Sequence, residues 1–125
     1  MPWRLLTLLT ILVIVLATTW PWTDFRGHPH WDKVEWLPIR RDLVVRDLWL
    51  NLLLFVPSGY CVRRAWPQLS PGRVLLGALA LSLAVESYQL FSHRRFPTVA
   101  DVLTNGLGAW IGARLAGGAS NGLSA

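Results

Sequence analysis

Seven polar side chains in this sequence have the types and spacing needed to hold a polar ligand. The acids supply negative charge, the amides can fix the orientation of a ligand, and the base can form paired hydrogen bonds with a phosphate or carboxylate. Neighbours three or four residues apart share one face of a helix. The seven residues are Asp47, Asn51, Glu86, Gln89, Arg95, Asp101 and Asn105, and we call them the polar cluster.

Glu86 is the residue of this set that most needs an explanation. A carboxylate about a turn and a half inside the end of an apolar helix must be paired with an arginine, protonated or hydrated. Arg94 or Arg95 could pair with it structurally. Alternatively, Glu86 could act as a general base assisted by Asp101 or His93, although the sequence offers no matching nucleophile. We therefore expect a binding protein in preference to an enzyme, with the enzyme as an alternative.

The remaining members of the polar cluster also have structural interpretations. Thr98 stands three residues before Asp101, which is the spacing of a helix N-cap followed by an acid near the positive end of the helix dipole. Asn51 and Asn105 could hold helices together through hydrogen bonds. These interpretations do not exclude a ligand.

A metal site has weak support in the sequence. Four residues of possible ligand type, Asp24, His28, His30 and Asp32, lie in a proline-rich connector, where solvated polar residues are common. Cys61 is the single cysteine, so cysteine-based metal patterns and an internal disulfide are excluded. We expect no metal and no cofactor.

The elements that position the polar cluster are four apolar blocks. Hydrophobic residues make up 53% of the 125 residues and charged residues 15%, and a block of about 20 apolar residues can cross the hydrocarbon of a bilayer as a helix. We predict an all-α membrane protein, a compact bundle of four transmembrane helices in a single domain over residues 1–125. The helices are expected at about 5–20, 47–62, 74–91 and 99–115.

The connector at residues 21–46 is expected to be irregular. Pro21, Pro29 and Pro38 exclude a continuous helix there. Trp31 and Trp36 favour a position against the membrane surface, since tryptophan prefers the headgroup level.

Four crossings place both termini on one side and the polar cluster near one membrane face. Helices 47–62 and 99–115 would both begin on the side where helix 74–91 ends. A short loop with Arg63, Arg64 and Arg73 and no acid nearby favours cytoplasmic termini in the bacterial inner membrane, although the long connector also carries bases. The formal net charge is +5, but the basic residues lie at helix ends and in connectors. Nucleic-acid-binding proteins gather such residues on one face, so we do not expect nucleic acid as a partner.

Two segments form a weak internal repeat. Asp47 and Asn51 are four residues apart, as are Asp101 and Asn105. With one helix between them, the two copies would run in the same direction, which suggests a duplicated helical hairpin.

Three segments together resemble the VanZ-like family of bacterial membrane proteins. The sequence Asn51-Leu-Leu-Leu-Phe-Val-Pro-Ser-Gly59 is similar to the family's Asn-x-x-x-Phe-x-Pro-x-Gly. Glu86-Ser-Tyr-Gln89 followed by Arg95 is similar to its Glu-x-x-Gln and Arg. Asp101-Val-Leu-Thr-Asn105 with the glycines at 108 and 112 is similar to its closing segment. The resemblance covers about residues 47–115, and Thr98 departs from the Asp that members often have there.

The resemblance implies a multi-helix membrane protein related to the one named for low-level teicoplanin resistance, and it implies no known reaction. Our main hypothesis is a cell-envelope protein whose polar cluster binds a membrane lipid, a lipid-linked cell-wall precursor or a glycopeptide. A structural protein that packs against a partner or itself is the third alternative, because Gly108 and Gly112 form a small-residue stripe.

Overall fold

The protein is an antiparallel arrangement of four α-helices in the part of the chain that the structure describes. The computed structural model describes residues 2–20, 26–34, 36, 41–92 and 97–122. The helices are α1 (Pro2–Thr19), α2 (Arg41–Ala65), α3 (Pro71–Gln89) and α4 (Val99–Gly122), and a short 3₁₀ helix, η2 (Trp31–Lys33), lies in the connector. No strand occurs among the described residues.

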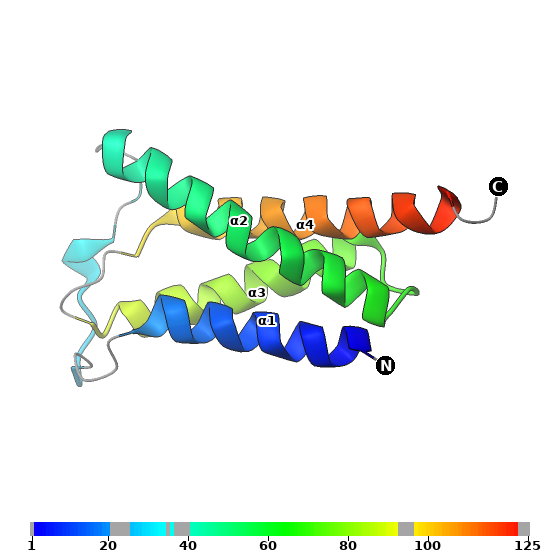
Figure 1. Ribbon diagram of the computed structural model, residues 1–125. Coiled ribbons are helices and arrows are strands. Elements are labelled where there is room, and N and C mark those ends of the chain that lie inside the picture. The colour runs from blue at the N-terminus through cyan, green and yellow to red at the C-terminus, as the bar shows by residue number, and fades with distance from the viewer. Residues whose placement is uncertain (1, 21–25, 35, 37–40, 93–96, 123–125) are drawn as a thin grey trace.

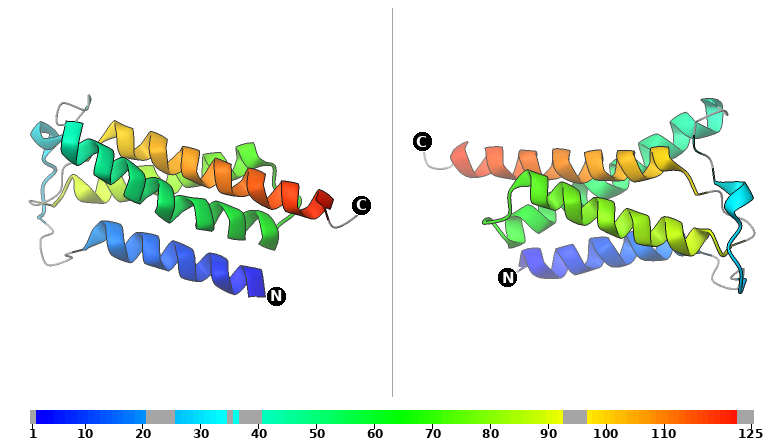
Figure 2. Two further views of the ribbon diagram at one scale, coloured as in Figure 1. Left: turned by 45° about the horizontal axis from the view of Figure 1, so that its top comes forward. Right: turned by 180° about the vertical axis from the view of Figure 1, so that it is seen from behind.

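The four helices lie along a common direction and alternate up and down (Figure 1). Both termini are at one end of the bundle, and the connector is at the other (Figures 1 and 2). Helices α2 and α4 therefore run in the same direction, as the internal repeat predicts. The prediction of four helices is confirmed. The end of α3 lies at the same end of the bundle as the starts of α2 and α4, as predicted (Figure 1).

One helix, α1, is long and apolar enough to cross a membrane by length and composition. The other three contain glycines and polar residues between their apolar residues. At 1.5 Å per residue, the helices of 18 to 25 residues are about 27 to 38 Å long.

Several predicted helix boundaries were wrong. Helix α2 begins at Arg41, six residues before the predicted start, and α4 continues to Gly122 through a tail that had been excluded. Both errors come from equating the helix with its apolar block, since polar turns extend a helix beyond such a block. Helix α3 begins at Pro71 because Ser70 caps it and accepts a hydrogen bond from the Arg73 amide at 3.3 Å, and proline is favoured in the first turn.

The interface between α2 and α4 is closed by small residues. A Cβ atom on Gly112 would come within 2.7 Å of the Tyr60 nitrogen, and one on Gly59 within 2.6 Å of the Ala109 Cα. Helix α2 is continuous through Pro57, which removes one donor from the helix ladder. The two backbones approach closely because no side chain separates them at these glycines.

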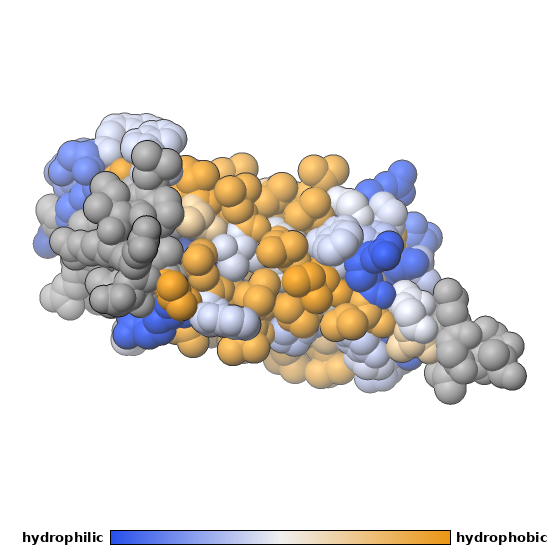
Figure 3. Space-filling model, turned by 90° about the horizontal axis from the view of Figure 1, so that it is seen from above, coloured by the Kyte–Doolittle hydropathy of each residue, from blue (hydrophilic) through white to orange (hydrophobic). Residues whose placement is uncertain are grey.

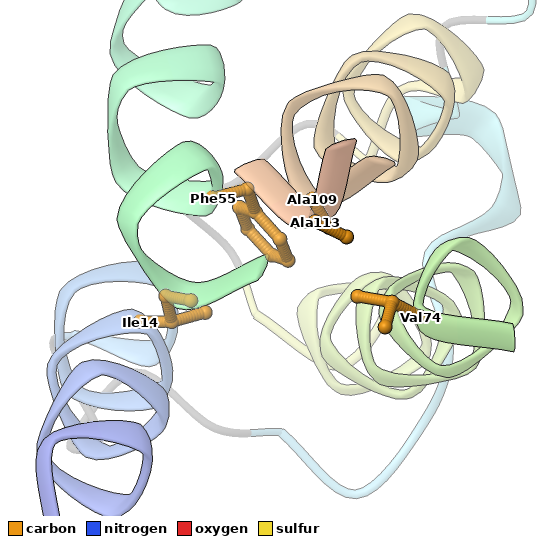
Figure 4. Packing of buried hydrophobic residues seen from close by; sticks show 5 residues of the cluster. All are labelled: Ile14, Phe55, Val74, Ala109 and Ala113. Atoms are coloured by element: carbon orange, nitrogen blue, oxygen red, sulfur yellow. The ribbon is translucent and has the colours of Figure 1, made fainter. Parts of the chain in front are cut away.

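The apolar core is small and draws on all four helices. It consists of Ile14, Phe55, Val74, Ala109 and Ala113 (Figure 4). The buried set also includes polar side chains, among them Thr7, Ser58 and Ser82. Two of the core side chains are alanines, so the bundle interior contains little bulky apolar material.

The outer surface is strongly apolar instead. Leucines are exposed on every helix, with Leu8, Leu53, Leu76 and Leu103 all more than 60% exposed. The face in Figure 3 is apolar along its middle and polar towards both ends. Large contiguous apolar surfaces of this kind are rare on soluble monomers.

Candidate functional site

The structure places the described members of the polar cluster at the end of the bundle that carries the connector. Glu86 and Gln89 are in the last turns of α3, while Asp101 and Asn105 are in the first turns of α4. Asp47 and Asn51 are in the first half of α2. Arg95, Arg94 and His93 lie outside the described residues.

Glu86 fastens the end of α3 to the start of α4. Its Oε2 accepts a hydrogen bond of 3.0 Å from the backbone N–H of Thr98. Thr98 is also the N-cap of α4, since its hydroxyl accepts from the Asp101 N–H at 3.0 Å. The capping arrangement predicted from the sequence is therefore present.

This junction differs from a usual capping box. In that motif the third residue of the helix accepts from the N-cap amide. Here Glu86, from the preceding helix, accepts from the Thr98 amide, while Asp101 occupies the third position. The bond engages one of the two carboxylate oxygens of Glu86 and gives this residue a structural role at the junction of α3 and α4.

Asn105 forms the second connection between α3 and α4, deeper in the bundle. Its Nδ2 donates to the Ser82 hydroxyl at 2.7 Å, and Asn105 and Ser82 are 4% and 1% exposed. The Oδ1 atom of Asn105 is buried and has no hydrogen-bond partner within the described part of the chain. If the Oδ1 and Nδ2 positions of Asn105 were exchanged, the contact with Ser82 would remain and the amino group would be the atom without a partner.

Gln89 connects α3 to α1. Its Nε2 donates to the backbone carbonyl of Thr18 at 2.9 Å, near the end of α1. The last carbonyls of a helix have no partner within the helix, so this side chain satisfies one of them. Gln89 is buried, and its amide therefore serves helix packing.

The connector contacts the same end of the bundle. The backbone amides of Arg26 and His30 donate to the carbonyls of Phe91 and Leu90 at 2.6 and 2.7 Å. Trp31 and Trp36 are both exposed. No group of three or more His, Cys, Asp or Glu side chains within the described segments could hold a metal ion, and Asp24 of the sequence-based set lies outside them.

Asp47 and Asn51 belong to the same end but are not tied to α3 or α4 by a described hydrogen bond. Asp47 forms an ion pair with its neighbour Arg46 at 3.4 Å, and its side chain is 49% exposed. The early turns of α2 project beyond the other helices (Figure 1). The polar cluster is thus a bonded α3/α4 group with a separate, more open pair on α2.

The register of α2 against α4 nevertheless places the two pairs at the same level. The close contacts pair Gly108 with Leu52 and Phe55, and Gly112 with Val56 and Tyr60. The residue numbers in these pairs differ by 52 to 56, and Asp47 and Asn51 precede Asp101 and Asn105 by 54 positions. The two Asp-x-x-x-Asn pairs therefore lie at about the same level along the parallel helices α2 and α4.

Two partners in this site were not foreseen from the sequence. The Thr98 amide and the Thr18 carbonyl are backbone groups, which carry no signal of residue type. Ser82 stands four residues before Glu86 and so shares its face of α3, but its pairing with Asn105 depends on the relative rotation of α3 and α4.

Comparison with known proteins agrees with the resemblance found in the motifs. Searches among curated proteins and among solved structures gave no match. The sequence profile of the VanZ/LLP1 family matches residues 3–118, so the match extends through the first helix and connector, where no family motif had been found. On this evidence the chain belongs to the VanZ/LLP1 family.

Proposed function

We propose that the chain is a multi-pass protein of the bacterial cytoplasmic membrane, with all four helices in the bilayer and both termini in the cytoplasm. Leucines are exposed on every helix, while several polar side chains are buried inside the bundle. This distribution supports the proposal, because a soluble bundle buries its leucines and exposes its polar residues. Length also permits it, since even the shortest helix, α1 with 18 residues, nearly matches the hydrocarbon thickness.

Within this membrane protein, the polar cluster would bind the polar group of a lipid, a lipid-linked cell-wall precursor or a lipoglycopeptide. The observation that carries this proposal is the unpartnered buried amide atom of Asn105. Buried polar atoms of native proteins are almost always hydrogen-bonded, and one left without a partner costs about 1–3 kcal/mol. A ligand that completes its hydrogen bonding would recover that cost.

The test is a binding titration on purified protein in phospholipid nanodiscs. A polyprenyl-diphosphate-linked cell-wall precursor and teicoplanin would be added separately, and intrinsic tryptophan fluorescence would be recorded. Loss of one hydrogen bond of about 1.4 kcal/mol corresponds to about tenfold weaker binding. We expect that loss for Asn105→Ala with at least one of the two ligands.

Thr104→Ala is the matched control. Thr104 is the neighbouring residue on α4, but its hydroxyl donates to the Ala100 carbonyl of its own helix at 2.7 Å. Binding should therefore survive this change. Equal binding by wild type and Asn105→Ala, or an equal loss in Thr104→Ala, would reject Asn105 as a ligand contact.

A further inference from the structure

The opposite end of the bundle, where both termini lie, is rich in arginine and contains no acid. It carries five arginines: Arg4, Arg63, Arg64, Arg73 and Arg114. All seven Asp and Glu residues of the chain fall within 24–47 and 86–101, which belong to the connector end. The positive charge of these arginines is therefore not balanced by Asp or Glu side chains at the same end.

Aromatic rings hold three of these arginines in place. The Arg64 guanidinium lies 5.1 Å from the Trp3 ring centroid, and Arg4 lies 5.7 Å from Trp66. These two contacts are reciprocal, since each joins the start of α1 to the end of α2. Arg114 stacks on Trp110 of its own helix at 5.5 Å. Tryptophan and arginine are typical of the headgroup level of a membrane.

Arg63 differs from these three arginines. Its Nε and Nη1 atoms are buried and have no hydrogen-bond partner among the described residues. Buried N–H groups without an acceptor are costly, even though the Arg63 residue as a whole is partly exposed, and the fork of donors is shaped for the oxygens of a phosphate. Arg64 follows it in the sequence, and Arg4 contacts Trp66 three residues further along the chain, so both add positive charge at this end of the bundle.

We propose that this corner, formed by the start of α1 and the end of α2, is a binding site for the phosphate of an anionic phospholipid, with Arg63 as the principal contact. The Arg63 side chain would turn towards the surface and place its unpartnered N–H groups on the phosphate oxygens. Arg4 and Arg64, held by Trp66 and Trp3, would neutralise the remaining charge. The inference rests on the membrane location proposed above and is independent of the polar cluster at the other end.

The experiment compares full-length protein in nanodiscs of phosphatidylcholine with and without phosphatidylglycerol. Retained phosphatidylglycerol is counted by native mass spectrometry at high ionic strength, where attraction to exposed charges is screened. Arg63→Gln should bind phosphatidylglycerol about tenfold more weakly, as expected for the loss of a charged hydrogen bond. Arg63→Lys should be intermediate, because it keeps the charge and loses the fork.

Arg73→Gln is the control for net charge. Arg73 is at the same end and exposed, so at high ionic strength its removal should leave lipid retention unchanged. Equal retention in wild type and Arg63→Gln, or an equal loss in Arg73→Gln, would overturn the site. Displacement of the lipid by inorganic phosphate at low concentration would overturn its assignment to a lipid headgroup.

Insertion of wild type into phosphatidylcholine discs separates this proposal from the previous one. Failure to insert would overturn the membrane location, and the lipid site with it. Insertion without any preference for phosphatidylglycerol would overturn the lipid site alone. The result of the Asn105 titration does not depend on the lipid site, because Asn105 lies at the other end of the bundle.

Discussion

Helix α4 packs against α2 and α3 by different means. Towards α2 it presents Gly108, Ala109 and Gly112, and the two backbones meet with almost no side chain between them. Towards α3 it presents the Thr98 amide and the Asn105 side chain, which form hydrogen bonds with Glu86 and Ser82. The α2/α4 interface depends on shape, whereas the α3/α4 interface adds these polar partners to a close contact of Gly106 with Leu75 and Leu79.

This difference indicates where function can be sought. At a glycine contact the two helix backbones approach closely, and a side-chain atom added there would force them apart. A polar contact has donors and acceptors that a ligand can also use, and Asn105 retains one such atom without a partner. We therefore expect mutations at the first interface to remove the protein, and conservative mutations at the second to remove activity while leaving the protein in place.

The largest effect on stability is expected for Gly112→Ala. The new Cβ would lie against the Val56 carbonyl and within 2.7 Å of the Tyr60 nitrogen, so α2 and α4 would have to separate. Overpacking costs about 1–3 kcal/mol and occasionally more, and we expect the upper end of this range because the new Cβ would meet backbone atoms. Thermal unfolding of the purified variant should therefore show a clearly lower midpoint temperature than that of wild type.

Gly77→Ala on α3 is the matched control for that change. A Cβ atom at Gly77 would meet nothing within 4 Å, so the substitution should stabilise the helix by up to about 1 kcal/mol. If both variants unfold alike, the α2/α4 glycine contact does not determine stability.

A smaller effect is expected at Glu86. Glu86→Ala leaves the Thr98 amide without its acceptor, which should destabilise the fold by about 1–3 kcal/mol. Glu86→Gln keeps an oxygen in the same place and should remain folded. Hydrogen exchange of the Thr98 amide provides the readout: faster exchange is expected in the alanine variant, and an unchanged rate would show that this bond is not maintained.

The smallest of the three effects is expected at Ser82. Ser82→Ala removes the acceptor of the Asn105 amino group and should cost about 1 kcal/mol. Ser87→Ala is its control, because that exposed hydroxyl bonds to the Leu83 carbonyl of its own helix at 2.7 Å. Denaturation should show a lower midpoint for Ser82→Ala than for Ser87→Ala. Equal midpoints would show that the Ser82 hydrogen bond does not stabilise the α3/α4 interface.

The sequence was sufficient to predict the helices and the end of the bundle at which polar residues gather. The connection between α3 and α4 is short and the two helices run in opposite directions, so Glu86 and Asp101 had to lie at the same end. The capping of α4 by Thr98 was also predictable, because an N-cap is a local arrangement. These features depend only on order and spacing along the chain.

The partners of each polar side chain could not be predicted in the same way. The contact of Glu86 with the Thr98 amide depends on how α3 is rotated against α4, and spacing does not encode that rotation. The predicted start of α2 was wrong because the prediction counted apolar residues alone, and the helix begins at the polar residue Arg41. The docking of the Arg26 and His30 amides on the end of α3 involves backbone groups alone and leaves no pattern in the sequence.

The central claim is that the α3/α4 polar junction is a working site as well as a structural one. The most direct test is teicoplanin susceptibility of a sensitive bacterium that expresses wild type, Glu86→Gln or Asp101→Asn, with membrane levels measured in parallel. We predict protection by wild type and loss of protection by both variants at equal abundance. No protection by wild type, or equal protection by the variants, would contradict the claim, as would a loss that simply follows reduced abundance.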